Sequence, residues 1–173
     1  VHIYGAHEFK QQGDSEAANI TWWNEFAGYC ESINPDVYLV GEVWQDDKVL
    51  ENYVQPFDTK FDFAIQQKIL NCVQKGMAVP GFGDSLSVAI ENIQNKYDGV
   101  DANYLNGIFG ANHDQDRIAS SVNSLDKARQ IAAVYMTLPG NPYIYYGEEL
   151  GMYGSKPDEM IRTPFLWGGD STY

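Results

Sequence analysis

Residues 14–44 read DSEAANITWWNEFAGYCESINPDVYLVGEVW, and this stretch determines the fold class. In its first part, apolar residues recur at steps of three and four, which predicts an amphipathic helix over 14–34 that Pro35 ends. The β-branched and apolar run at 37–43 then predicts a buried strand. A helix followed directly by a buried strand indicates an α/β unit.

The same alternation continues along the chain. Helices are predicted at 64–74, 84–97 and 124–138, and strands at 105–110 and 142–146. The inward side chains of the helix over 84–97 are expected to be Val88, Ile93 and either Ala89 or Ile90. Strands that alternate with helices of this length pair in parallel through right-handed crossovers. Because no linker or repeat interrupts the pattern, a single α/β domain over residues 1–173 is expected.

Composition narrows the classes of partner. The net charge is -13, from 11 basic and 24 acidic residues, so nucleic acid and anionic membrane surfaces are disfavoured as partners. No apolar run approaches the about 18 residues that span a membrane, and the first residues lack the features of a signal peptide. The sequence leaves the location open, with a secreted or cell-surface parent protein favoured. The two cysteines have no metal-binding spacing and are expected to be structural thiols.

Glu42 is the first candidate for chemistry. It closes an almost uncharged strand on which Tyr38, Val40, Glu42 and Trp44 share one face. Apolar surroundings favour the protonated form of a carboxyl group, which a general acid requires. The alternative is that Glu42 already turns into solvent at the strand end.

A second candidate stands at residues 112–117, NHDQDR, directly after a predicted strand. Strand ends on one rim are where barrels place catalysis. The alternate oxygens do not form an EF-hand, because that loop needs Gly at its sixth position and Glu at its twelfth, where Arg117 and Asn123 stand. The alternative is that Asp114 or Asp116 only caps a helix. No metal site and no dinucleotide site is predicted.

Taken together, these motifs resemble the α-amylase superfamily, glycoside hydrolase family 13. Residues 41–44 (GEVW) and Phe109 with residues 112–114 (NHD) resemble its third and fourth signature regions. Residues 140–149 (GNPYIYYGEE) resemble its eighth barrel strand and the following turn. The resemblance covers essentially the whole chain. It implies roughly the fifth to eighth units of a (β/α)8 barrel, which is a half-barrel fragment.

The resemblance also implies roles for individual residues. Glu42 matches the acid/base group of a retaining glycosidase, and Asp114 matches the acid that stabilises the transition state. The residues expected to bind an α-glucan such as starch or maltodextrin are His2, Trp44, His113, Asp158 and Arg162. The last two keep the family's Asp-x-x-x-Arg spacing, although a surface salt bridge would have the same spacing. The sequence does not decide whether α-1,4 or α-1,6 bonds are cleaved. It also does not decide whether the reaction is hydrolysis or glucosyl transfer.

The family's nucleophilic Asp lies four residues before the position of His2, and would therefore precede Val1. The chain alone is expected to be inactive and to self-associate, because a cut barrel exposes strand edges near Val40 and Tyr145. No cofactor is expected to be required. Calcium is possible in the parent enzyme, although its main ligands would come from other segments. The alternatives are a non-catalytic amylase-like interaction domain and a sugar-binding module.

Overall fold

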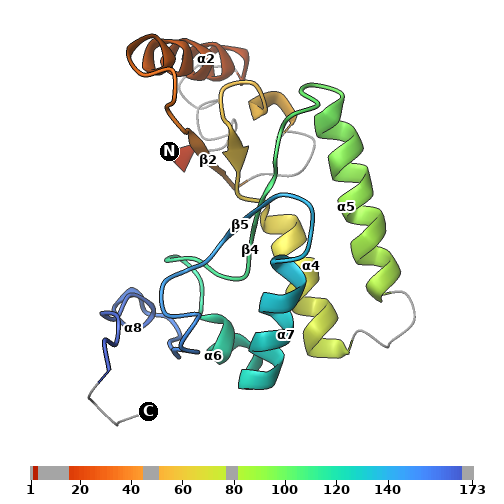
Figure 1. Ribbon diagram of the computed structural model, residues 1–173, viewed down its shortest axis with the longest axis vertical. Helices are drawn as coiled ribbons and strands as arrows, with labels where there is room; N and C mark the ends of the chain where they lie inside the picture. Colours follow the sequence, from red (N-terminus) through yellow and green to blue (C-terminus); the bar gives the residue numbers. More distant parts are fainter. Residues whose placement is uncertain (1, 4–15, 45–50, 77–81, 169–173) are drawn as a thin grey trace. The chain divides into compact units, whose positions relative to one another are not determined.

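A computed structural model of the chain describes residues 2–3, 16–44, 51–76 and 82–168 (Figure 1). These residues form two compact units that are interleaved in the sequence. The first unit comprises Val1–Ile65, Ser87–Gly107 and Pro139–Asn141, and the second comprises Gln66–Leu86, Ile108–Leu138 and Pro142–Tyr173. That the chain acts as a single domain stays a prediction. None of the described helices has the length and apolar character needed to span a bilayer.

The first unit contains a parallel sheet of three strands. Their order is β1 (His2–Ile3), β2 (Val40–Val43) and β3 (Thr59–Lys60). His2 is in register with Glu42, and Val40 is in register with Thr59. The predicted parallel pairing is therefore confirmed. The expectation that the strand near Val40 lies at an edge is wrong, because β2 has a hydrogen-bonded neighbour on each side.

Strand β3 was not predicted from the sequence. Its neighbourhood, residues 58–62, reads DTKFD, and three charged side chains in five residues give no apolar run. The backbone pairs nonetheless, and Phe61 extends the ladder by a parallel bridge to Gly107. A Cβ atom on Gly107 would lie 2.5 Å from the carbonyl oxygen of Lys60, so this approach of two backbones requires glycine.

Helix α2 (Glu16–Ile33) confirms the predicted first helix. Trp23 and Ala27 are buried, and the ring of Trp23 lies 5.4 Å from that of Phe57. Its apolar stripe is not buried along its whole length, because Ile33 in the last turn is exposed. The following strand begins at Val40 rather than at residue 37. Directly before this strand, the amide of Leu39 donates a 2.6 Å hydrogen bond to a carboxylate oxygen of Asp58.

Helices α4 (Phe63–Lys75) and α5 (Phe82–Asp98) also appear where they are predicted, and each begins in one unit and ends in the other. On α5 the buried side chains are Leu86, Ile93 and Tyr97. Val88 was expected inward but is 53% exposed. A step of 100° per residue moves Val88 off the stripe that Leu86, Ile93 and Tyr97 share.

The second unit holds three further helices, α6 (Ile118–Val122), α7 (Leu125–Tyr135) and α8 (Asp158–Ile161). Helix α7 is the one predicted over 124–138, and it ends three residues earlier than expected. Its N-cap is Ser124, whose side-chain oxygen accepts a 3.3 Å hydrogen bond from the amide of Lys127. Ile131 and Tyr135 form its buried face.

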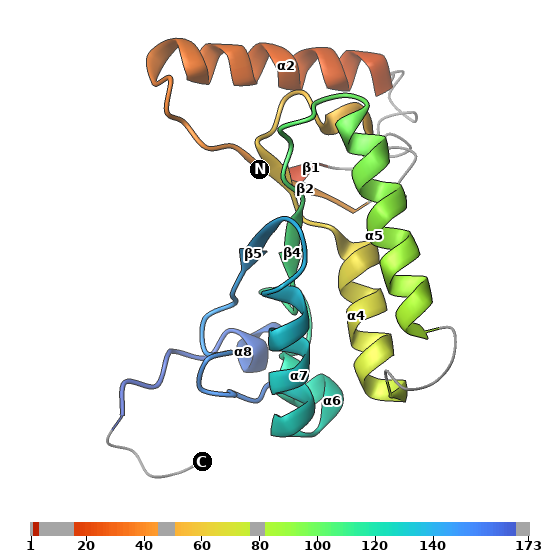
Figure 2. The same cartoon turned by 45° about the vertical axis from the view of Figure 1, so that its right-hand side comes forward.

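The strands predicted near 105–110 and 142–146 are observed as β4 (Gly107–Phe109) and β5 (Asn141–Tyr143), which together form a two-stranded sheet (Figure 2). Both are shorter than predicted. Gly140 directly before β5 has a φ of 130°, a conformation that glycine adopts without strain. Cys30 and Cys72 are free thiols, as expected.

Candidate active site

Glu42 lies at the carboxyl end of β2, in the first unit. It is 9% exposed, so the side chain does not turn into solvent. The indole Nε1–H of Trp44 donates a 3.2 Å hydrogen bond to its Oε1. The carboxyl group of Glu42 therefore already accepts one hydrogen bond. The donor is a residue that the sequence predicts on the same strand face.

Trp44 is held in turn by Phe63, the first residue of α4. The two rings stack with centroids 3.8 Å apart and an interplanar angle of 28°. The sequence did not single out Phe63, because it comes from a different segment and carries no polar group. His2 pairs through its backbone with Glu42, and its side chain lies outside the described part of the chain.

The other predicted acid, Asp114, belongs to the second unit, in the turn after β4. Asn112, which is buried, shapes this turn, because its side-chain oxygen accepts a 3.0 Å hydrogen bond from the amide of Asp114. His113 is exposed, and its Nε2 lies 3.3 Å from Oδ2 of Asp114. The alternative that Asp114 caps a helix is not what the structure shows, since α6 begins only at Ile118 and its N-cap is Arg117.

Arg162 joins the remaining predicted residues. Its Nη2 donates a 2.5 Å hydrogen bond to Oδ1 of Asp114, and its Nε donates a 2.8 Å hydrogen bond to the backbone carbonyl of His113. The same Nη2 lies 2.8 Å from Oδ2 of Asp158, one helical turn away. The structure therefore brings four predicted residues together within the second unit, and the Asp158–Arg162 pair is more than an isolated surface salt bridge.

Asp158 has a further partner that the sequence did not suggest. Lys156 donates a hydrogen bond to its Oδ1. This hydrogen bond, with the nearby charges of Arg162 and Lys156 itself, holds the pKa of Asp158 below its usual range. The carboxylate is thus anionic near neutrality, which suits a group that accepts hydrogen bonds from hydroxyls.

Within either unit taken by itself, the described side chains include no group of three or more His, Cys, Asp or Glu residues placed to hold one metal ion. Chemically, the arrangement offers a buried carboxyl group on a strand end and a hydrogen-bonded cluster of Asp, His and Arg side chains. Such groups can exchange a proton and bind polyhydroxyl compounds.

Known proteins resemble this chain over nearly all of its length. The family described as "Alpha amylase, catalytic domain" matches residues 5–169. Alpha-amylase 3 of Dictyoglomus thermophilum is 42% identical over 160 residues, which cover 91% of this chain and 31% of that protein. The 4-alpha-glucanotransferase of Thermotoga neapolitana is 32% identical over 163 residues, covering 91% of this chain and 34% of that protein.

Solved structures agree with this result. The crystal structure of alpha-amylase from H. orenii superposes with a TM-score of 0.78 at 40% identity, covering 87% of this chain and 30% of that chain. The chain belongs to the family of α-amylase catalytic domains. It has the fold of part of a TIM barrel, and it spans about a third of the length of the relatives it matches.

Proposed function

We propose that this chain is part of a retaining glycoside hydrolase that acts on α-glucans such as starch or maltodextrins. The observation that carries the proposal is Glu42, a buried carboxyl group that accepts a hydrogen bond from Trp44 at the end of β2. Membership of a family whose named relatives include α-amylases and 4-α-glucanotransferases supports the substrate class. We take hydrolysis as the reaction, and analysis of the products from maltooligosaccharides separates it from glucosyl transfer.

In such an enzyme two carboxyl groups flank the scissile bond about 5 to 5.5 Å apart. Glu42 protonates the leaving oxygen, and its anion then removes a proton from the water that hydrolyses the glycosyl-enzyme. By resemblance, the nucleophile is an Asp four residues before His2. These 173 residues do not include it, and by themselves they are expected to give no turnover of maltooligosaccharides.

Asp114 does not form a covalent bond in this scheme. It accepts hydrogen bonds from hydroxyls of the reacting sugar, and these bonds strengthen as the ring becomes oxocarbenium-like. His113 and Arg162 keep this carboxylate oriented. Asp158 and Arg162 bind the neighbouring glucose unit, and Trp44 supplies an apolar surface beside Glu42. Calcium, where the full-length enzyme binds it, is held mainly by ligands outside these residues.

The test is Glu42→Gln in the full-length protein, with hydrolysis of soluble starch as the assay. Glutamine keeps the size of the side chain but cannot exchange the proton, so turnover should fall by about 10² to 10⁴-fold. The matched control is Glu31→Gln, the same change on an exposed residue of α2. More than about a tenth of the original turnover in Glu42→Gln would refute the assignment. If the unaltered full-length protein binds starch without hydrolysing it, a non-catalytic amylase-like domain is the better description.

A further inference from the structure

Among the residues that the structure describes, Arg117 is the largest fully buried side chain, with 1% of its surface exposed. Its Nη1 donates a 2.6 Å hydrogen bond to the backbone carbonyl of Tyr146, and its own amide donates 2.9 Å to the carbonyl of Gly154. In the described part of the chain, no acceptor lies within hydrogen-bond distance of its Nε or Nη2. Burying a charged group whose donors are only partly satisfied is destabilising, so the position of this guanidinium calls for a reason beyond packing.

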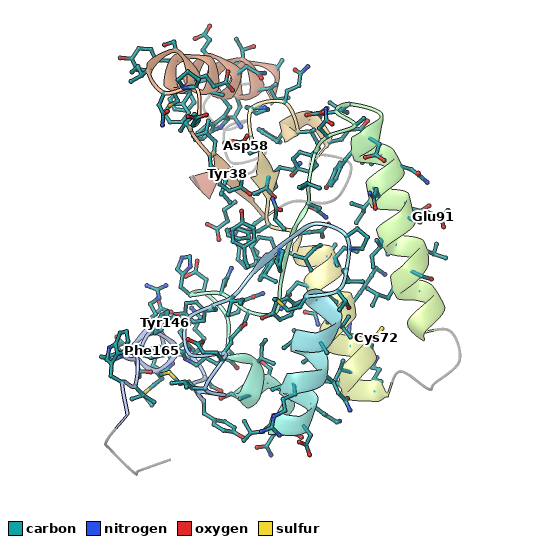
Figure 3. The ribbon with its side chains drawn as sticks, viewed as in Figure 1. Tyr38, Asp58, Cys72, Glu91, Tyr146 and Phe165 are labelled. Atoms are coloured by element: carbon teal, nitrogen blue, oxygen red, sulfur yellow. The ribbon has the colours of Figure 1, made fainter. Side chains whose placement is uncertain are left out.

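The guanidinium lies against two tyrosine rings. Its central carbon is 4.8 Å from the ring centroids of both Tyr145 and Tyr146, and these two centroids are 4.7 Å apart. Tyr146 is labelled in Figure 3. Arginine is suited to this place, because a flat guanidinium attracts ring faces and still donates hydrogen bonds. Gly147 makes room for the contact, since a Cβ atom there would lie 3.0 Å from Nη1 of Arg117.

The two tyrosine hydroxyls reach the segment that carries Arg162. The hydroxyl of Tyr145 donates a 3.1 Å hydrogen bond to the carbonyl of Ile161, and that of Tyr146 donates a 2.7 Å hydrogen bond to the carbonyl of Thr163. The residues on both sides of Arg162 are therefore tied to the pair of rings that Arg117 contacts. Arg162 in turn donates to Asp114, three residues before Arg117. These contacts form a closed cycle, from Arg117 through the two tyrosines and Arg162 to Asp114, which lies in the same segment between β4 and α6 as Arg117.

We infer that Arg117 is a positioning residue that acts on Asp114 through Tyr145, Tyr146 and Arg162. It fixes the tyrosine pair, the pair fixes the backbone around Arg162, and Arg162 fixes the carboxylate of Asp114. The inference rests on the proposed function, because it concerns how the transition-state-stabilising acid is held. All of these contacts lie within the second unit.

The first test is Tyr146→Phe in the full-length protein, with kcat and KM measured on a maltooligosaccharide. The ring is 37% exposed and stays in place, and only the hydroxyl that binds the Thr163 carbonyl is lost. The loss of one hydrogen bond should lower kcat by about two- to tenfold with little change in KM. Tyr145→Phe should behave in the same way. The control is Tyr153→Phe, an equal change at an exposed tyrosine of the same unit, which should leave kcat unaltered.

The second test separates positioning from general stability by a double-mutant cycle. In an Arg162→Ala background, Tyr146→Phe and Arg117→Lys should lower kcat by less than about twofold, because their effect passes through Arg162. Equal losses in both backgrounds would overturn the inference, as would unchanged kcat in all single variants at Tyr145, Tyr146 and Arg117.

A crystal structure of the Tyr146→Phe protein gives a result that needs no activity. The contact between Arg162 and Asp114 should lengthen beyond hydrogen-bond distance or lose order, and an unchanged contact would overturn the inference. If the unaltered full-length protein does not act on α-glucans, the proposed function fails, and this structural result still decides whether Arg117 and the tyrosine pair hold Arg162 in place.

Discussion

The carboxylate of Asp114 accepts a hydrogen bond from Arg162, and the backbone amide of Asp114 donates to the side-chain oxygen of Asn112, so the carboxylate is held in place before any sugar binds. We expect Asp114→Asn in the full-length enzyme to lower kcat by more than tenfold, in the about 10² range, and to change KM little, because the interaction strengthens only in the transition state. Steady-state kinetics on maltooligosaccharides measure this. A raised KM with unchanged kcat would show ordinary substrate binding instead. Asp126→Asn, on the exposed side of α7, is the matched control.

Lys60 makes stability depend on pH. Its Nζ is 4.3 Å from the ring centroids of Tyr97 and Tyr104, and burial lowers its pKa to about 7, against the opposing charge of Asp62. In the unfolded chain a lysine titrates near pH 10.4, at about its reference value. Between these two values the unfolded state binds more protons, so the free energy of unfolding should rise as the pH rises from about 7 to about 10.

Urea unfolding at several pH values across this window measures the slope. Lys60→Met keeps an unbranched chain without the charge and should flatten the rise. The exposed Lys75→Met is the control and should leave it unchanged. The same slope in the Lys60→Met and unaltered proteins would show that another group is responsible.

Many individual residues of the candidate site could be predicted from the sequence, because each signature is a run of adjacent residues. Glu42 and Trp44 are two positions apart at the end of β2, and Asp158 and Arg162 are one helical turn apart. The partners that orient them could not be predicted. Phe63 meets Trp44 only after the chain has folded back, and nothing in the segment around Arg117 indicates that its guanidinium lies against Tyr145 and Tyr146, about 30 residues later.

At the scale of elements, the start of α7 gives a local test. The side-chain oxygen of Ser124 accepts the amide hydrogen of Lys127, which would otherwise have no partner within the helix. Ser124→Ala should lower the free energy of unfolding by about 1 kcal/mol. Ser124→Asp keeps an oxygen in the same place and should retain most of the stability. Equal losses in both variants, by urea titration, would show that the cap contributes nothing.

The four longer helices, α2, α4, α5 and α7, were predicted well, because 11 to 18 residues repeat their apolar period several times. Strands were predicted less well, since β3 has two residues and β4 and β5 have three each, which is too short for a pattern to repeat. The charged sequence around β3 was misleading for a physical reason: the aliphatic stem of Lys60 is buried while its ammonium group meets aromatic faces.

At the scale of the molecule, exposed apolar groups predict association of the isolated chain. Trp22, Tyr29 and Ile33 are exposed along α2, at spacings that place them near one another on the helix. We expect the 173-residue chain, expressed alone, to form a dimer or larger species at micromolar concentration. Light scattering measures this, and serine at Trp22 and Tyr29 should weaken the association. A compact monomer of 19.5 kDa with cooperative unfolding would contradict the prediction.

The interleaving of the two units bears on how the protein is made. Each unit is assembled from three separate segments, and the last segment of the first unit is Pro139–Asn141. The side-chain amide of Asn141 donates 2.9 Å to the hydroxyl of Tyr38, across 103 residues of sequence. A ribosome must therefore synthesise more than a hundred residues after Tyr38 before the first unit can close. During that time the first unit lacks its later segments, and the dependence of the nascent chain on chaperones should be greatest in this interval of translation.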